Sequence, residues 1–249
     1  MTKIPKAHPR YLSLITREKI SEAEKKGFVH KTGLIAHGRG EAFDYLIGEK
    51  TLSFADNAEK TAAATLIYAK NPVISVNGNV VALSAEEIIR LSKKVNAKIE
   101  VNLFHRTDIR MKKLVEELES KGAKEVCGLK ADAHIPGLDH DRGLCDKDGI
   151  YSSDAVLVPL EDGDRCQALK NMEKKVITID LNPLSRTAKT ADITIVDNIV
   201  RAIPNITNYV ELLKSKDKKD IEKIILEWDN KKMLKEVCSF ISKRLNSLF

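Results

Sequence analysis

The hydrophobic residues of the chain form two kinds of pattern, helical spacing and short continuous runs. Residues 11–26 and 55–70 carry apolar side chains at helical spacing, which predicts two helices in the N-terminal part. Short continuous apolar runs, such as residues 156–158, are typical of strands buried on both faces. By these criteria we expect strands at residues 73–76, 98–104, 124–128, 154–160, 175–181 and 192–196. We also expect a helix that begins at residue 84, a short helix that follows the strand at 154–160 and ends at about residue 174, and helices at 108–121, 206–214 and 219–248.

Strands that alternate with helices predict an α/β fold with a mostly parallel sheet and helices on both faces. The 249 residues suffice for one large domain or two small ones. We favour a single domain, residues 1–249, with an N-terminal helical part (1–70), a sheet core (71–200) and C-terminal helices (206–249). In such folds ligands bind beyond the carboxyl ends of the strands, so we search there for functional residues.

Polar residues gather at four of the predicted strand ends. Each cluster alone is more simply explained as a turn, because turns favour Asn, Asp and Gly for backbone reasons. Four clusters along one edge of a sheet favour a ligand site. The clusters are Asn-Gly-Asn at residues 77–79, His105 with Arg106, Glu-Asp-Gly-Asp-Arg at residues 161–165, and Asp-Leu-Asn at residues 180–182.

The Asn77-Gly78 pair leaves two interpretations open. It could form a tight hairpin turn, since a second apolar run follows at residues 80–83. Alternatively, the glycine lets backbone amides approach an anion. Ser84 is a suitable helix cap, and Glu87, three residues later, completes a capping-box pattern.

Two further segments have side chains that suit phosphate. Residues 37–44 are predicted to form a loop in which Arg39 lies between two glycines, although an ordinary surface loop is the simpler interpretation. Residues 183–188 place Ser, Arg and Thr near an expected helix start, where they could bind phosphate or simply cap the helix. Asn198 follows the last strand and could contact a nucleotide or merely end that strand.

The net charge of +6 and the pI near 9.0 permit nucleic-acid binding but suit anionic metabolites equally well. The lysine-rich residues 214–223 also carry acidic side chains, so we interpret them as a solvated helix start and expect no nucleic-acid partner. No run of eighteen apolar residues and no signal-like segment occurs, so we expect a cytoplasmic protein without a membrane partner.

Several common chemistries find no motif in the sequence. No P-loop, GxGxxG fingerprint or GxSxG elbow is present. The polar residues 134–145 have no spacing typical of a zinc site. The cysteines form no CxxC pair, so we expect reduced thiols; they are Cys127, Cys145, Cys166 and Cys238.

Five long segments of the chain resemble one protein family, the archaeal-type phosphopantothenate synthetases, also called 4-phosphopantoate–β-alanine ligases. The resemblance extends from about residue 9 to residue 206. The segments are GLIAHGRGEAFDY at residues 33–45, PVISVNGN at 72–79, KIEVNLF at 98–104, VPLEDGDR at 158–165 and IDLNPLSRT at 179–187.

The resemblance implies an enzyme of coenzyme A biosynthesis that joins 4-phosphopantoate to β-alanine. It implies that ATP is consumed, that AMP and diphosphate are released, and that magnesium is required. A Rossmann-like sheet and a homodimer are also implied. The ATP contacts of the family fall on Arg17, Arg39, Asp180, Leu181, Asn182, Arg186, Thr187, Asn198 and Ile199.

We assign roles within this expected reaction. Arg39 and Arg186 are the candidate catalytic residues at the ATP phosphates, because a forked guanidinium matches phosphate geometry. Strand-end position alone suggests Asn77, Asn79, His105 and Arg106 for 4-phosphopantoate. The carboxylates of Glu161, Asp162 and Asp164 are the candidate magnesium ligands.

Two other functions share these features. An ADP-forming kinase of a pantoate-like metabolite would need the same anion site. A non-enzymatic nucleotide-binding regulatory module would also use basic side chains, but the clustered His, Arg and carboxylate residues argue against it.

Overall fold

The centre of the molecule is a five-stranded parallel sheet. The computed structural model describes residues 4–247. The strands lie in the order β2-β1-β5-β6-β7, and every neighbouring pair is parallel. Counted within this sheet the order is 2-1-3-4-5, a doubly wound arrangement whose switch point lies between β1 and β5. The strands are β1 (Pro72–Val76), β2 (Lys98–Val101), β5 (Ala155–Leu157), β6 (Lys175–Ile179) and β7 (Ile193–Ile195). The predicted α/β class is therefore confirmed.

Successive strand residues face opposite sides of the sheet, and both sides are buried. On β6, Ile177 and Ile179 join one hydrophobic cluster, whereas Val176 joins another on the opposite face. On β5, Leu157 and Val156 divide in the same way. This two-sided burial explains why the strands are continuous apolar runs in the sequence.

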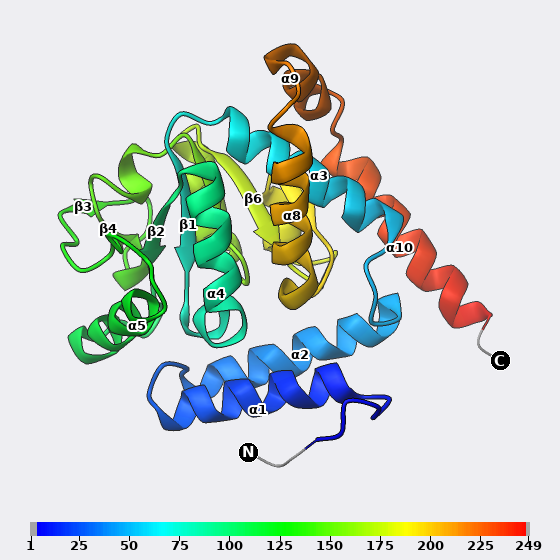
Figure 1. Ribbon diagram of the computed structural model, residues 1–249, viewed down its shortest axis with the longest axis horizontal. Coiled ribbons are helices and arrows are strands. Elements are labelled where there is room, and N and C mark those ends of the chain that lie inside the picture. The colour runs from blue at the N-terminus through cyan, green and yellow to red at the C-terminus, as the bar shows by residue number, and fades with distance from the viewer. Residues whose placement is uncertain (1–3, 248–249) are drawn as a thin grey trace.

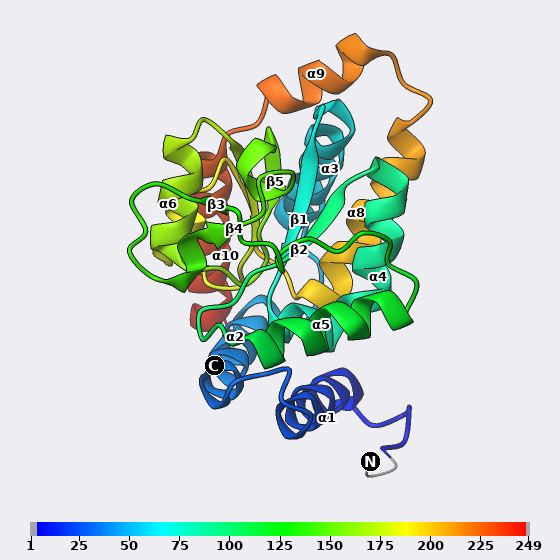
Figure 2. The same cartoon turned by 90° about the vertical axis from the view of Figure 1, so that its left-hand side faces the viewer.

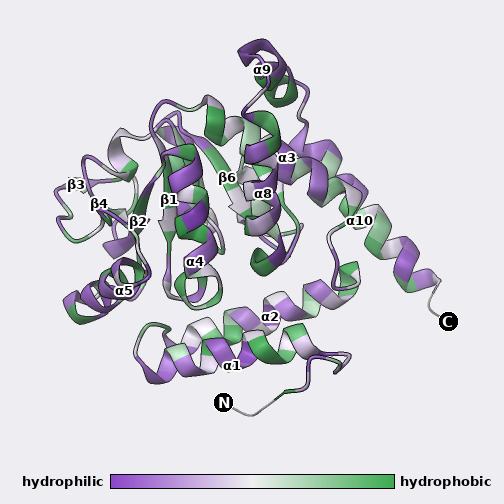
Figure 3. Cartoon of the chain, in the orientation of Figure 1, coloured by the Kyte–Doolittle hydropathy of each residue, from purple (hydrophilic) through white to green (hydrophobic). Residues whose placement is uncertain are grey.

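Helices cover both faces of the sheet, as Figures 1 and 2 show. On one face α3 and α8 pack together and α4 packs against α8, with α5 beside β2; on the other lie α6, α7 and α10. Hydrophilic and hydrophobic segments alternate along α4 and α8 in Figure 3, as expected of helices with one face buried. These helices are α3 (Ser53–Tyr68), α4 (Gly78–Val95), α5 (Asp108–Ser120), α6 (Gly163–Asn171), α7 (Arg186–Thr190), α8 (Ile199–Leu213), α9 (Lys218–Leu226) and α10 (Asn230–Asn246).

A pair of N-terminal helices, α1 (Tyr11–Lys25) and α2 (Lys31–Ile47), lies across the carboxyl ends of the strands (Figure 1). The loop predicted at residues 37–44 is wrong, because this segment lies within α2. Its glycines concealed the helix, since glycine has low helix propensity. Close packing explains Gly33, where a Cβ atom would lie 2.5 Å from the Asn79 Oδ1 atom.

The Asn77-Gly78 pair starts a helix, so the hairpin interpretation is wrong. The Asn77 side chain caps α4 by accepting a hydrogen bond from the Val80 N–H at 3.1 Å. Ser84 has non-helical backbone angles, φ −144° and ψ 23°, and lies at a kink where two helical segments of α4 meet, as its predicted place at a helix start requires. Its hydroxyl makes no hydrogen bond within the described residues, so the predicted capping bond does not form.

Other predicted elements differ in their limits. Residues 124–128 contribute only an isolated bridge, Glu100 to Cys127. The polar residues 134–145 begin and end in two short antiparallel strands, β3 (Ala133–His134) and β4 (Leu144–Cys145).

The C-terminal helix predicted at 219–248 is divided into α9 and α10, because Asp229 caps α10 by accepting from the Lys232 N–H. Its predicted end at Leu248 lies outside the described residues. α8 begins before its predicted start and accommodates Pro204. Within residues 4–247, no helix combines the length and apolar character needed to cross a membrane.

Candidate active site

A cavity of about 950 Å³ lies between α2 and the carboxyl ends of the strands. Its walls come from α1, α2 and the segments that follow all five strands of the sheet. It therefore includes the switch point between β1 and β5, where doubly wound sheets bind ligands. The volume is near the upper end of the roughly 300–1,000 Å³ typical of small-molecule sites. The cavity can therefore accommodate a large ligand or two smaller ones.

Most residues predicted from the sequence line this cavity. Three do not line it: Arg17, Arg106 and Asp164. Those that line it are Arg39, Asn77, Asn79, His105, Glu161, Asp162, Asp180, Leu181, Asn182, Arg186, Thr187, Asn198 and Ile199.

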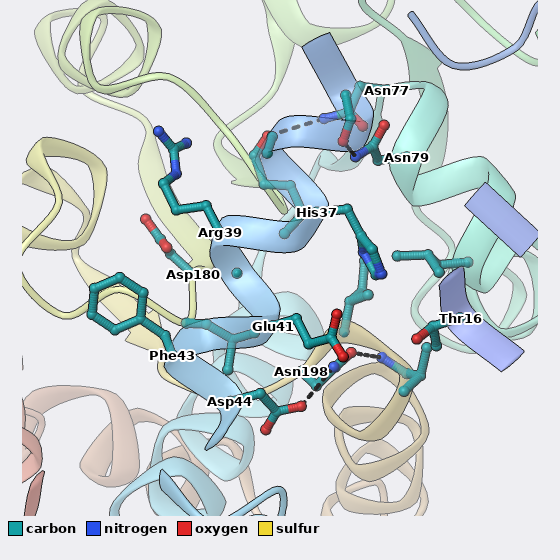
Figure 4. Close-up of a pocket in the computed structure, with 18 of the residues that line it drawn as sticks. Thr16, His37, Arg39, Glu41, Phe43, Asp44, Asn77, Asn79, Asp180 and Asn198 are labelled. Atoms are coloured by element: carbon teal, nitrogen blue, oxygen red, sulfur yellow. Dashed lines mark hydrogen bonds between the residues drawn. The ribbon is translucent and has the colours of Figure 1, made fainter. Parts of the chain in front are cut away.

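Asp180 directly follows β6 and is held in place by its own loop. Its carboxylate accepts hydrogen bonds from the Asn182 N–H at 2.9 Å and from the Ser185 hydroxyl at 2.5 Å. Burial raises the pKa of the Asp180 carboxyl, although both donors and the charge of Arg39 oppose this. Figure 4 shows Arg39 on the same side of α2 as Asp180. The exposed Arg39 guanidinium makes no hydrogen bond or ion pair within the described chain, so it is free to bind an anion.

Arg186 opens the short helix α7. Ser185 caps this helix by accepting from the Ala188 N–H at 2.9 Å, which confirms the capping interpretation. The Arg186 side chain is 73% exposed and pairs with Asp164 at 2.7 Å. Exposed pairs of this kind contribute little stability, so a phosphate could replace Asp164 as the partner of Arg186 at small cost.

A buried ion-pair network connects α2 to the end of β7. Arg201 donates to Asp44 at 2.6 Å and to Asp197 at 2.5 Å. The Asn198 side chain also donates to Asp44, at 2.8 Å, while its own oxygen caps α8 (Figure 4). The network therefore fixes α2, which carries Arg39, relative to Asn198.

The other half of the cavity lies at the ends of β1 and β2. Asn77 donates to the Leu160 carbonyl at 3.1 Å, and Asn79 donates to the Gly33 carbonyl at 2.9 Å. Both side chains thus join segments of the cavity wall to one another. Arg106 donates to the Gly128 carbonyl at 2.7 Å and contributes nothing to the cavity lining. Arg110, four residues later in the first turn of α5, lines the cavity instead.

Arg17 lies in an adjacent groove and is already paired. Its guanidinium donates to Glu41 at 2.8 Å, and the Tyr45 hydroxyl donates to the same carboxylate at 2.6 Å. Burial opposes ionisation of Glu41, but these two donors and the charge of Arg17 lower its pKa overall. Glu41 lines the cavity, so Arg17 contacts a cavity-lining residue without lining the cavity itself.

The carboxylates proposed as magnesium ligands do not fit an ion site. Glu161 is buried and forms ion pairs with both Arg142 and Arg165. Burial opposes ionisation of Glu161, yet the two arginines lower its pKa overall. Asp162 pairs with Arg142 at 3.1 Å, and Asp164 pairs with Arg186. No group of three or more potential metal-ligating side chains forms within residues 4–247.

The chain matches a family model and several known proteins. The family model described as phosphopantothenate/pantothenate synthetase matches residues 54–244 of the chain. The chain belongs to this family. The 4-phosphopantoate–beta-alanine ligase of Thermococcus onnurineus is 55% identical over 249 residues, which cover all of this chain and 95% of that protein. The ligases of the same name from Thermococcus kodakarensis and Methanosarcina mazei are 53% and 52% identical, over 95% and 98% of their lengths.

Several cavity residues of this synthetase-family protein were not predicted from the sequence. Asp44 and Arg201 meet although they are 157 positions apart. Arg142 lies in the long loop that was interpreted only as polar. For Arg110 a signal existed, because it lies in the first turn of the helix predicted at residues 108–121, directly after the cluster of His105 and Arg106.

Proposed function

We propose that this protein is an ATP-dependent ligase that joins 4-phosphopantoate to β-alanine in coenzyme A biosynthesis. The observation that carries the proposal is a single cavity in which unpaired or loosely paired arginines face the ends of five parallel strands. Identity of 51–55% with relatives named as this ligase supports the choice of substrates.

The chemistry requires activation of a carboxylate, because a carboxylate does not react with an amine at neutral pH. The 4-phosphopantoate carboxylate attacks the α-phosphorus of ATP, and diphosphate leaves. The neutral amine of β-alanine then attacks the carbonyl of the acyl-adenylate. The C–O bond to AMP breaks as the amide forms, and the amine proton is lost. Two mutually repelling anions must therefore share one cavity, and arginines offset that repulsion.

We assign the ATP phosphates to Arg39 and Arg186, which lie at the β6–β7 side of the cavity. Asp180, Leu181 and Asn182 suit the ribose or adenine, because a carboxylate beside a triphosphate would repel it. Thr187, Asn198 and Ile199 line the same side. Arg17 would have to exchange Glu41 for a phosphate in order to contact ATP directly.

Four further expectations belong to the proposal. They are magnesium, a homodimer, a cytoplasmic location and a single ligase domain. Phosphate and water oxygens supply most ligands of a magnesium ion bound with a nucleotide, so no cluster of protein carboxylates is required.

The first experiment is a product assay in which each reactant is omitted in turn. With ATP, magnesium, 4-phosphopantoate and β-alanine present, we expect AMP and 4′-phosphopantothenate, and no product when either acid is absent. Oxygen-18 in the carboxylate of 4-phosphopantoate should appear in AMP. Release of ADP would instead identify a kinase or an acyl-phosphate route and refute the proposal.

The second experiment tests Arg39. Arg39→Ala should lower kcat by roughly 10²–10³-fold, the scale for losing one donor to developing charge in the transition state. Arg90→Ala is the matched control, because Arg90 is an exposed helical arginine outside the cavity. Equal activity of the two variants would defeat the assignment.

A further inference from the structure

Two buried carboxylates lie next to each other beneath the cavity, close to the end of β7. They belong to Glu59, in α3, and to Asp197, which follows β7. Their exposed fractions are 0% and 1%. Asp197 lines the cavity, whereas Glu59 does not. Neither carboxylate takes part in the reaction proposed above, so burying both needs a separate explanation.

Asp197 has hydrogen-bond donors for both of its oxygen atoms. Its Oδ1 atom accepts from the Asn198 backbone N–H at 2.7 Å and from the Arg201 Nε atom at 2.8 Å. Its Oδ2 atom accepts from the Thr51 hydroxyl at 2.5 Å. A guanidinium and further donors favour the charged form of a buried carboxylate, so Asp197 is the ionised member of the pair.

Glu59 has far fewer partners. Its Oε2 atom accepts from the Asn205 side chain at 3.0 Å, and the same amide group donates to the Thr51 hydroxyl oxygen at 3.3 Å. Its Oε1 atom is buried and makes no hydrogen bond to another donor within residues 4–247. Two ionised carboxylates only accept hydrogen bonds, so a bond between Glu59 and Asp197 requires a proton on one of them.

The surrounding charges place that proton on Glu59. Asp197 shares its only cation, Arg201, with Asp44 of α2, and Asp56 of α3 adds a further negative charge near Glu59. The other helices packed against α3, α9 and α10, form no hydrogen bond or ion pair with the two carboxylates in the described part of the chain. Burial and the charge of Asp197 raise the pKa of Glu59 to about 9, which agrees with a neutral Glu59 that donates to Asp197.

Asp197 connects this proton to the nucleotide side of the cavity. The Asn198 side chain, next in sequence, donates to Asp44 of α2 at 2.8 Å (Figure 4). Arg201 also joins Asp197 to Asp44. Asn198 lines the side of the cavity assigned to ATP, and α2 carries Arg39. A displacement of Asp197 therefore changes how Asn198 and α2 are placed around the nucleotide.

We propose that Glu59 is a positioning residue, which donates a buried proton to Asp197 and thereby holds Asn198 and α2 in the arrangement that binds ATP. This inference rests on the proposed function. When the proton leaves at high pH, two buried negative charges face each other, and their repulsion displaces Asp197. The affinity for ATP then falls. Because linked equilibria are reciprocal, ATP binding strengthens proton binding at Glu59 by the same factor.

The test measures the Kd of ATP by calorimetry at pH 8 and pH 10, on either side of the pKa of Glu59. Both acids are left out, so that no turnover occurs. The last pKa of a phosphate group is about 6, so ATP itself keeps its charge over this range. Coupling between two linked sites is typically about 5–150-fold, so the Kd of the wild type should rise by at least about fivefold.

Glu59→Gln carries an amide N–H in place of the buried proton at every pH. Its Kd for ATP should therefore remain constant between pH 8 and pH 10. Glu119→Gln is the matched control, because Glu119 is an exposed residue of α5 that does not line the cavity. This control should follow the wild type at both pH values.

The alternatives give different results. A wild-type Kd that is equal at both pH values overturns the inference without reference to any variant. If the Kd of Glu59→Gln rises as much as that of the wild type, other groups cause the change and Glu59 has only a structural role. Wild-type protein that binds no ATP at either pH refutes the proposed function instead. Pulsed hydrogen exchange then tests the inference without nucleotide: protection of α2 should fall at pH 10 in the wild type but not in Glu59→Gln, and equal changes in both would overturn it.

Discussion

The ion-pair network beneath the cavity predicts the effect of removing Arg201. Its side chain is 17% exposed, and its partners Asp44 and Asp197 are 7% and 0% exposed. Arg201→Met keeps most of the aliphatic stem but removes the charge between two carboxylates. Both carboxylates then remain buried without their common counter-ion.

The expected cost follows from this burial. Breaking a buried ion pair by removing one partner destabilises a protein by about 3–5 kcal/mol. Asp44 keeps its hydrogen bond from Asn198, and Asp197 keeps one from Thr51 at 2.5 Å, so we expect a value near the lower end, about 3 kcal/mol. The same change at Arg90, whose side chain is 53% exposed and pairs with Glu87, should cost less than about 1 kcal/mol.

Urea unfolding of the two variants at neutral pH measures this difference. We expect the midpoint of Arg201→Met to fall well below that of Arg90→Met, with the slope m unchanged. Adding Asp44→Asn to Arg201→Met should recover part of the stability, because one uncompensated charge is removed. If Arg201→Met is as stable as Arg90→Met, the network does not anchor α2, and the reasoning is refuted.

Three other substitutions have defined outcomes. Burial and the nearby charge of Asp197 raise the pKa of Glu59. The folded protein therefore keeps a proton that the unfolded chain releases, and stability should fall as pH rises above the ordinary glutamate pKa, by up to about 1.4 kcal/mol per pH unit. Glu59→Gln should flatten this slope in urea unfolding between pH 5 and pH 9, and an unchanged slope would contradict the assignment. Gly78→Ala should destabilise by about 1–3 kcal/mol, because the new methyl group meets the Phe28 carbonyl oxygen. Gly38→Ala, with no atom within 4 Å of the added Cβ, should instead stabilise α2 by about 0.5–1 kcal/mol; thermal unfolding distinguishes these opposite signs.

Local sequence patterns were sufficient to predict the sheet and the edge at which the cavity lies. Apolar runs bounded by Asn, Asp and Gly mark buried parallel strands, and all five strands of the sheet lie within or close to the predicted ranges. The cap at Ser185 follows from residue type alone. These features depend on neighbours a few positions apart.

The missed features depend on tertiary contacts. The glycine-rich stretch around Arg39 is helical although glycine has low helix propensity, and contacts such as that of Gly33 with Asn79 and the ion pair of Asp44 with Arg201 hold α2 in place. The contact of Glu161 with Arg142, 19 positions earlier in the chain, helps to convert a candidate metal ligand into a buried ion-pair partner. No local pattern indicates these contacts.

The central claim is that one edge of the sheet holds ATP and a phosphorylated acid side by side. A crystal structure with a non-hydrolysable ATP analogue and 4-phosphopantoate tests it most directly. We predict nucleotide phosphates within hydrogen-bonding distance of Arg39 and Arg186, and the second phosphate at the end of β2. A nucleotide whose phosphates lie away from both arginines would contradict the account.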